Sequence, residues 1–144
     1  MIDGSTRLGA RILERLFADR VIWMTTVDRG TPQPAPVWFL YERGELEERS
    51  IVYTKTDARR VANLRDNSNV AFNFNCTTNG EEVHVVRGHG RIALELPPVL
   101  HCKPYMDRYR DWVETDEAWG RTFEGFAAQY SVPIEITDLA IWGW

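Results

Sequence analysis

The segment that decides the fold is Ile51-Val52-Tyr53-Thr54-Lys55-Thr56-Asp57-Ala58-Arg59-Arg60-Val61-Ala62-Asn63-Leu64. Its first three residues are β-branched or aromatic, and such residues favour a strand. Thr56 and Asp57 are residue types that cap the start of a helix, and apolar residues then recur every third position from Ala58. The segment therefore predicts a strand that leads directly into a helix.

Hydroxyl groups and cations gather where this strand meets the helix. The hydroxyls belong to Thr54 and Thr56, and the cations are Lys55, Arg59 and Arg60. The free N–H groups and the dipole of a helix N-terminus favour a bound anion. No Glu or Gln follows three residues after the predicted cap to neutralise that positive end. We interpret the junction as a phosphate site; the alternative is an ordinary surface helix with solvated charges.

Composition limits the classes of partner. A chain of 144 residues can bury the core of one domain, which we place at residues 1–144. The net charge of −4 argues against a nucleic-acid partner, because such binding neutralises many phosphates. Cys76 and Cys102 have no metal-ligand spacing and fit a reducing cytosol. No apolar run approaches the roughly 20 residues of a membrane span. We expect a cytoplasmic protein without metal, nucleic-acid or membrane partners.

Hydrophobic periodicity predicts about six strands with helices at the periphery. A first helix follows a Ser5 or Thr6 cap, and two more follow Pro98, the second of them carrying an apolar face from Trp119 to Tyr130 and entered through Thr115-Asp116. The expected strands cover residues 21–27, 33–41, 51–53, 70–75, 83–94 and 134–136. This order predicts a mainly β fold, a small antiparallel β-barrel with peripheral helices.

Prolines and glycines in two of these strands predict local departures from regular strand structure. Pro34 and Pro36 cannot donate ladder hydrogen bonds, so we expect an edge strand there, with backbone groups free for a ligand. Gly88 and Gly90 predict a bend in the strand that contains them. The polar turn Asp28-Arg29-Gly30 predicts a hairpin.

Other kinds of chemistry find little support. The chain has no nucleophile-elbow or triad pattern, so we name no catalytic residue. His84 and His89 stand five apart on one predicted strand and would face opposite ways, which excludes a shared metal or haem site and predicts histidines on the sheet surface. Trp142 and Trp144 would share one face of a last strand, where we expect core or dimer packing.

With these elements placed, the chain resembles the FMN-binding split-barrel superfamily of pyridoxamine-5'-phosphate-oxidase-like proteins, and within it a group of actinobacterial coenzyme F420-dependent enzymes. The matching segments are residues 23–27, 36–40, 54–64, 130–134 and 142–144. The resemblance and the chemistry of the strand–helix junction together predict the cofactor-binding residues Pro36, Val37, Trp38, Thr54, Lys55, Thr56, Arg59 and Arg60. Arg60 stands where the pattern usually has Lys, and still supplies a cation. Asp57 adds a negative charge that lowers phosphate affinity unless it caps the helix.

The resemblance also implies a homodimer with the cofactor in a groove between subunits. The implied function is an oxidoreductase that transfers hydride to or from a small organic substrate through coenzyme F420, a deazaflavin. FMN is the alternative cofactor, because both have a tricyclic ring, a ribityl chain and a phosphate. Lys55 and Arg65 could extend the phosphate site toward the anionic tail of the deazaflavin. A non-catalytic cofactor carrier is the alternative of a different class.

Overall fold

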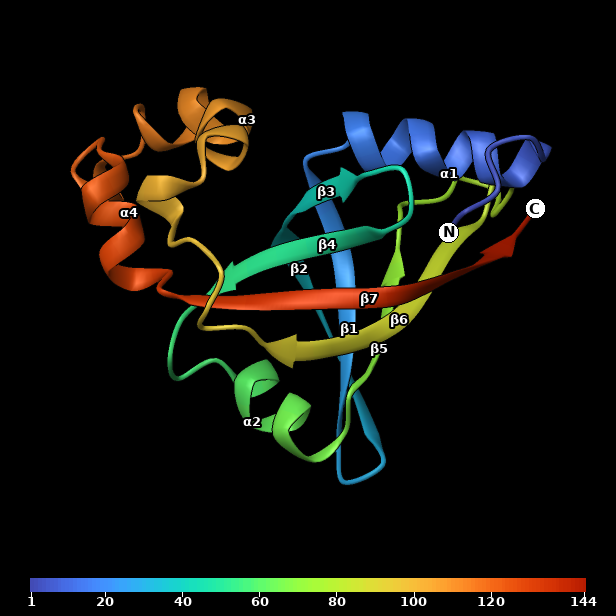
Figure 1. Ribbon diagram of the computed structural model, residues 1–144, viewed down its shortest axis with the longest axis horizontal. Coiled ribbons are helices and arrows are strands. Elements are labelled where there is room, and N and C mark those ends of the chain that lie inside the picture. The colour runs from blue at the N-terminus through green and yellow to red at the C-terminus, as the bar shows by residue number, and fades with distance from the viewer.

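The computed structural model describes residues 1–144 and contains one antiparallel sheet of seven strands (Figure 1). Their order across the sheet is β2-β1-β5-β6-β7-β4-β3. The strands are β1 Val21–Asp28, β2 Thr31–Trp38, β3 Leu40–Arg43, β4 Glu48–Thr54, β5 Asn69–Asn73, β6 His84–Ile92 and β7 Val132–Gly143. The predicted mainly β fold is confirmed, with one strand more than expected.

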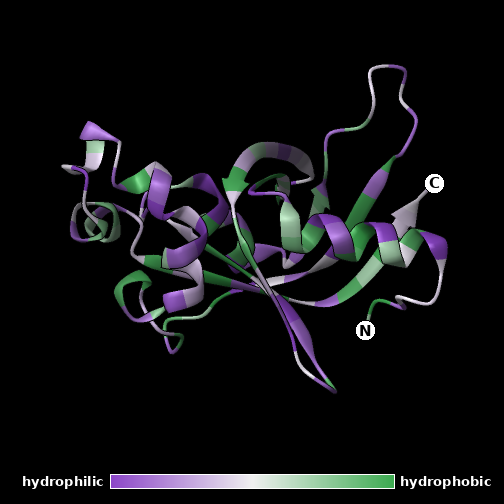
Figure 2. Ribbon diagram, turned by 90° about the horizontal axis from the view of Figure 1, so that it is seen from above, coloured by the Kyte–Doolittle hydropathy of each residue, from purple (hydrophilic) through white to green (hydrophobic).

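Four α-helices and two short 3-10 helices accompany the sheet. The α-helices are α1 Arg7–Ala18, α2 Arg59–Asp66, α3 Lys103–Val113 and α4 Phe123–Gln129, and the 3-10 helices are η1 Val99–His101 and η2 Glu117–Trp119. Figure 1 shows α3 and α4 together at one end of β7, with α1 and both termini toward its other end. Hydrophobic and hydrophilic stretches alternate along the helices in Figure 2, as expected when one helix face packs and the other meets solvent. None of the helices has the length and apolarity needed to cross a membrane.

The extra strand arises because the run expected as a single strand over residues 33–41 divides at Phe39. Its first part, β2, pairs with β1 at one edge of the sheet, while its second part, β3, pairs with β4 at the other edge. Consecutive strands at opposite edges require the sheet to curl, and β2 accordingly approaches β4. The chain therefore forms a half-barrel that is split beside Phe39.

The hydroxyl of Tyr109 on α3 holds this division in place. It accepts a hydrogen bond from the Phe39 N–H at 2.8 Å. It also lies 2.8 Å from the Phe39 carbonyl and 2.7 Å from the Arg20 carbonyl, either of which can accept its proton. Both Phe39 and Tyr109 are fully buried. One phenol thus satisfies backbone groups that the interrupted ladder leaves without strand partners.

The other local signals in the strands are mostly confirmed. Strand β2 is an edge strand, so its three prolines cost no ladder hydrogen bonds. The β1–β2 hairpin turns through Arg29 and Gly30, both with positive φ (47° and 84°), as a tight hairpin requires. Strand β6 has a bulge between Arg87 and His89, as Gly88 predicted. A Cβ at Gly88 would lie 2.7 Å from the Thr137 carbonyl oxygen, which explains the glycine.

Helix boundaries depart from the sequence in two places. The Thr6 side chain caps α1 as expected, accepting from Gly9 N at 3.0 Å. The Thr56 and Asp57 cap is wrong: α2 begins at Arg59, and its N-cap Ala58 offers no side-chain acceptor. The apolar face from Trp119 to Tyr130 is also not one helix. Asp116 caps η2, the chain turns through two residues of positive φ, and Thr122 then caps α4.

Three further expectations need correction. The last strand is not confined to residues 134–136, because β7 runs unbroken over twelve residues to Gly143. His84 is buried instead of lying on the sheet surface, since it shares the inward face of β6 with the buried Val86 two residues on. Of the two packing roles expected for Trp142 and Trp144, packing in the core of the chain is wrong: 52% and 65% of their surfaces are exposed, and their rings meet edge to face at 5.4 Å. Packing in a dimer stays a prediction.

The core has two parts. A barrel core of 16 buried residues includes Met24, Phe39, Phe72 and Ile134. A second core of 10 residues lies between the outer side of β4 and the helices inserted between β6 and β7, and includes Tyr105, Tyr109 and Phe126. Tyr109 joins the two cores through its hydroxyl bonds to Phe39.

Replacing Tyr109 with Phe should lower the free energy of unfolding by about 1–3 kcal/mol, because buried backbone groups of Phe39 and Arg20 lose their partner while the ring remains. Urea denaturation measures the change. The matched control is Tyr105→Phe, one turn earlier on α3, whose hydroxyl has no partner in the chain. Equal stability of the native protein and Tyr109→Phe would contradict this role of the hydroxyl.

Candidate functional site

A cavity of about 380 Å³ lies where the barrel meets the helical insertion. Strands β2 and β4, the turn before α2, and the inserted helices all contribute to its wall. Its lining residues are Pro36, Val37, Trp38, Tyr53, Thr54, Lys55, Asp57, Ala58, Arg60, Tyr105, Trp119, Phe126 and Tyr130.

One end of the cavity is cationic. Arg60 Nη1 donates a hydrogen bond of 2.6 Å to Thr54 Oγ1, and Thr54 is almost completely buried at the end of β4. Burial lowers the pKa of the half-buried Arg60, an effect that the neighbouring Tyr130 phenol partly opposes. Arginine remains protonated despite such a shift. The cavity thus holds a partly desolvated cation with no carboxylate bonded to it.

The start of α2 adds to this positive end. The helix has neither a side-chain cap nor an acidic residue in its first turn, so its first N–H groups are left free. Before it, the Ala58 N–H donates to the Lys55 carbonyl at 3.2 Å and closes a turn. This turn directs Lys55 over the Tyr130 ring, with Nζ 5.5 Å from the ring centroid. A helix terminus and two cations therefore meet at one place.

A wall of parallel, stacked aromatic rings adjoins this cationic end at Tyr130. Trp38 lies on Tyr109, with centroids 4.6 Å apart and planes 8° apart, and its other neighbour Phe126 is at 5.4 Å and 11°. Phe126 in turn stacks on Tyr130 at 4.4 Å and 10°. Trp119 meets three of these rings edge-on, at 5.0 to 6.1 Å. Several of these rings line the cavity, and an aromatic lining suits a planar ligand.

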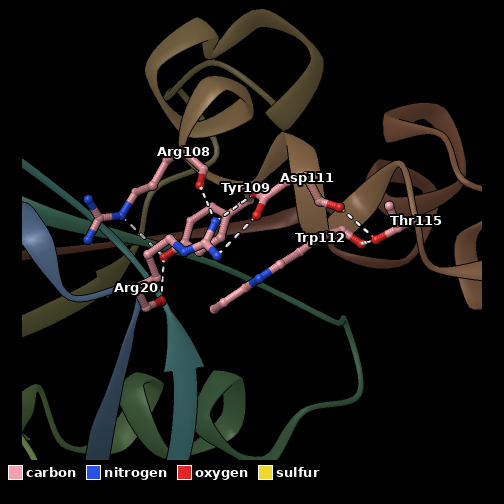
Figure 3. Close-up of polar contacts among 6 residues, drawn as sticks. All are labelled: Arg20, Arg108, Tyr109, Asp111, Trp112 and Thr115. Carbon is pink, nitrogen blue, oxygen red and sulfur yellow. Dashed lines mark hydrogen bonds and ion pairs between the residues drawn. The ribbon is translucent and has the colours of Figure 1, made fainter.

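Contacts of Arg20 hold the inserted helices against the barrel (Figure 3). Its guanidinium pairs with both oxygens of Asp111, at 2.6 and 3.2 Å, and also donates to the Arg108 carbonyl. It lies over the Trp112 ring, 3.6 Å from the centroid. The hydrogen bond from Arg20 lowers the pKa of Asp111. Arg20 thereby links the start of β1 to α3, and α3 supplies part of the aromatic wall.

The structure brings six of the eight predicted site residues to the cavity: Pro36, Val37, Trp38, Thr54, Lys55 and Arg60. Thr56 and Arg59 are exposed and do not line it. Consecutive residues of a helix face different ways, and of the two arginines that open α2 only Arg60 turns toward Thr54. Asp57 lines the cavity without capping the helix, so its negative charge remains beside Lys55.

Sequence reasoning missed five aromatic residues of the wall: Tyr53, Tyr105, Trp119, Phe126 and Tyr130. Apolar periodicity marked the stretch from Trp119 to Tyr130, which contains three of them, as a helix face that would pack. The only sequence signal for contacts between aromatic residues and a ligand was the high aromatic content, 12% with six Trp.

A larger cavity of about 760 Å³ lies beside the β3–β4 hairpin, but the buried carboxylates in its wall already have partners within the chain. The buried Glu48 carboxylate accepts from Ile2 N at 2.6 Å and from the Tyr41 hydroxyl at 2.5 Å. Glu135 is paired with Arg49 and Arg91. No cluster of three or more His, Cys, Asp or Glu residues is arranged to hold a metal ion. We therefore take the aromatic cavity as the candidate site.

Comparisons with known proteins give the family context. Residues 8–137 match the family described as Pyridoxamine 5'-phosphate oxidase. No curated protein matches the sequence.

Among solved structures, three illustrate the range of similar proteins. An F420 reductase has 21% identity and a TM-score of 0.61, with 90% of this chain and 94% of that chain covered. A FAD-binding protein of Mesorhizobium loti has 16% identity, a TM-score of 0.57 and coverages of 92% and 90%. The heme storage protein HutZ of Vibrio cholerae has 13% identity, a TM-score of 0.54 and coverages of 96% and 95%. At these identities the likeness concerns the fold alone.

Proposed function

This chain belongs to the pyridoxamine 5'-phosphate oxidase family, and on that premise we propose that it is a flavin- or deazaflavin-dependent oxidoreductase whose cofactor occupies the aromatic cavity. The observation that carries the proposal is the pairing of a cationic end, at Arg60 and Thr54, with a wall of stacked rings. A cofactor with a tricyclic ring and a phosphate needs both features. The bound cofactor would supply hydride or electron transfer at its ring.

The residues of the chain would bind and orient that cofactor. Arg60 and the open start of α2 fit a phosphate, because a guanidinium and free N–H groups complement its oxygens. The rings of Trp38, Trp119 and Tyr130 fit a flat ring and would exclude water from it. Asp57 opposes the phosphate, so we expect only moderate affinity at this end.

We place coenzyme F420 ahead of FMN. The deazaflavin continues beyond its phosphate into an anionic tail, which needs cations outside the cavity. Lys55 and Arg65 are exposed around α2 and could follow that tail. An F420 reductase is among the proteins that share this fold, as is a FAD-binding protein.

Titration of the purified protein with each cofactor, followed by quenching of tryptophan and cofactor fluorescence, tests this order. We expect tighter binding of coenzyme F420, because only its tail can reach the exposed cations. Binding of FMN at least about tenfold tighter, a difference of about 1.4 kcal/mol, would reverse the assignment.

Catalysis is the second part of the proposal, since a carrier could bind the same cofactor. A heme storage protein shares the fold, so the fold alone leaves both classes open. Mixing the protein and reduced cofactor with a panel of enones, quinones and tetrapyrroles separates them. Rapid reoxidation supports the enzyme, and tight binding without turnover on any of the panel supports the carrier.

Arg60→Ala should weaken binding of either cofactor about ten- to a hundredfold, because it removes a charge-assisted contact worth about 1.5–3 kcal/mol. Arg59→Ala is the matched control. This adjacent arginine is exposed outside the cavity, so its loss should change affinity less than about threefold. Fluorescence titration measures both variants. Unchanged affinity in Arg60→Ala would mean that the start of α2 is only a solvated helix end.

We further propose that the protein is a homodimer with its cofactor groove at the interface. A row of side chains crosses the outer face of the sheet in register: Pro36, Trp23, Asn73, Val85 and Trp142. Trp23 and Trp142 are 39% and 52% exposed, a large apolar area for one chain to leave in water. The row begins at Pro36, which also lines the cavity, so a second chain on this face would border the site.

Sedimentation should therefore show a dimer, and Trp142→Arg should shift it toward monomer by placing a charge in a desolvated interface. Leu46→Arg is the control, because Leu46 is 92% exposed at the β3–β4 turn, away from this face. A native protein that remains monomeric at all concentrations would contradict the proposal.

A further inference from the structure

The hydroxyl of Tyr105 is a buried polar group without a partner. Three buried side-chain atoms lack one: Ser50 Oγ, His84 Nδ1 and Tyr105 Oη. His84 lines a separate cavity beside Cys76, and Ser50 faces the interior of the barrel from β4. Tyr105 alone among them lines the aromatic cavity. Buried hydroxyls normally form hydrogen bonds, so one left free at a cavity wall points to a group that arrives with a ligand.

The rings packed against Tyr105 do not supply that group. Its ring contacts Tyr53 at 4.8 Å and Tyr109 at 4.9 Å. The Tyr53 hydroxyl donates to the Pro97 carbonyl at 2.6 Å, and the Tyr109 hydroxyl is bonded to backbone groups of Phe39 and Arg20. The Tyr53 and Tyr109 hydroxyls thus have other partners, and the third ring in contact, Phe126, has no polar atom. Tyr105 alone of these three tyrosines keeps an unused hydroxyl.

We propose that Tyr105 binds the ring of the cofactor, with its hydroxyl donating a hydrogen bond to a ring acceptor such as a carbonyl oxygen. This inference rests on the proposed function, because it deepens the account of the same cavity. It gives the cavity two polar ends, with Arg60 for the phosphate and Tyr105 for the ring.

Two properties of the site favour a neutral donor for the ring over a second phosphate contact. Desolvation raises the pKa of Tyr105 well above its usual value, and the neighbouring phenols add to the effect, so the hydroxyl stays protonated and can donate. Its surroundings are aromatic rings, where a doubly charged phosphate would be poorly solvated. The cations Lys55 and Arg60 instead lie beside Tyr130.

The test is Tyr105→Phe, titrated with FMN, riboflavin, coenzyme F420 and the deazaflavin ring lacking its phosphate. We expect each ligand to bind about two- to tenfold more weakly, by a similar factor with and without phosphate, because the lost bond is to the ring. Thermal unfolding of the ligand-free variant should be unchanged or shifted upward, since no bond within the chain is lost.

Two further variants serve as comparisons for Tyr105→Phe. Tyr109→Phe should lower the unfolding temperature, because its hydroxyl serves the backbone, whereas Tyr105→Phe should not. Arg60→Ala should weaken FMN and coenzyme F420 but not the two ligands without phosphate. A loss in Tyr105→Phe confined to the phosphate-bearing pair would overturn the ring contact.

Two other outcomes would also count against the inference. Unchanged affinity of Tyr105→Phe for ligands that the native protein binds would overturn this inference and leave the proposed function standing. A native protein that binds none of the four would overturn both.

Discussion

The fold depends on how the chain leaves one edge of the sheet and rejoins it at the other. Phe39 marks this point, and its peptide groups lie outside both strand ladders. Burying such groups without partners would cost several kcal/mol, so the split requires a substitute for the missing strand. The Tyr109 hydroxyl is that substitute. Because Tyr109 lies on α3, the opening of the barrel and the position of the inserted helices are fixed by the same contact.

This coupling explains why the candidate site lies where it does. Trp38 immediately precedes Phe39, so the contact that holds Phe39 also brings Trp38 onto the Tyr109 ring. Phe126 and Tyr130 continue the stack from α4. The Arg20–Asp111 pair alone would stabilise this arrangement little, because Asp111 is exposed. The buried rings provide most of the packing energy, and Arg20 sets the orientation of α3.

The local elements of the fold and the cationic end of the site could be predicted from the sequence. The strand and helix of residues 51–64, the edge strand of β2 and the bulge near Gly88 follow from residue types whose backbone preferences act over a few positions. The start of α2 did not follow from residue types. Thr56 and Asp57 lie in a turn closed by the Lys55 carbonyl, and the helix begins after this turn. The aromatic wall was beyond sequence reasoning, since Tyr105 and Phe126 reach Trp38 only through tertiary packing.

A structure of the protein crystallised with coenzyme F420 or FMN would test the central claim most directly. The account predicts a cofactor in the aromatic cavity, with its phosphate at Arg60 and its ring beside Trp38 and Tyr105. A cofactor bound instead in the larger cavity beside the β3–β4 hairpin, with the aromatic cavity left empty, would contradict it.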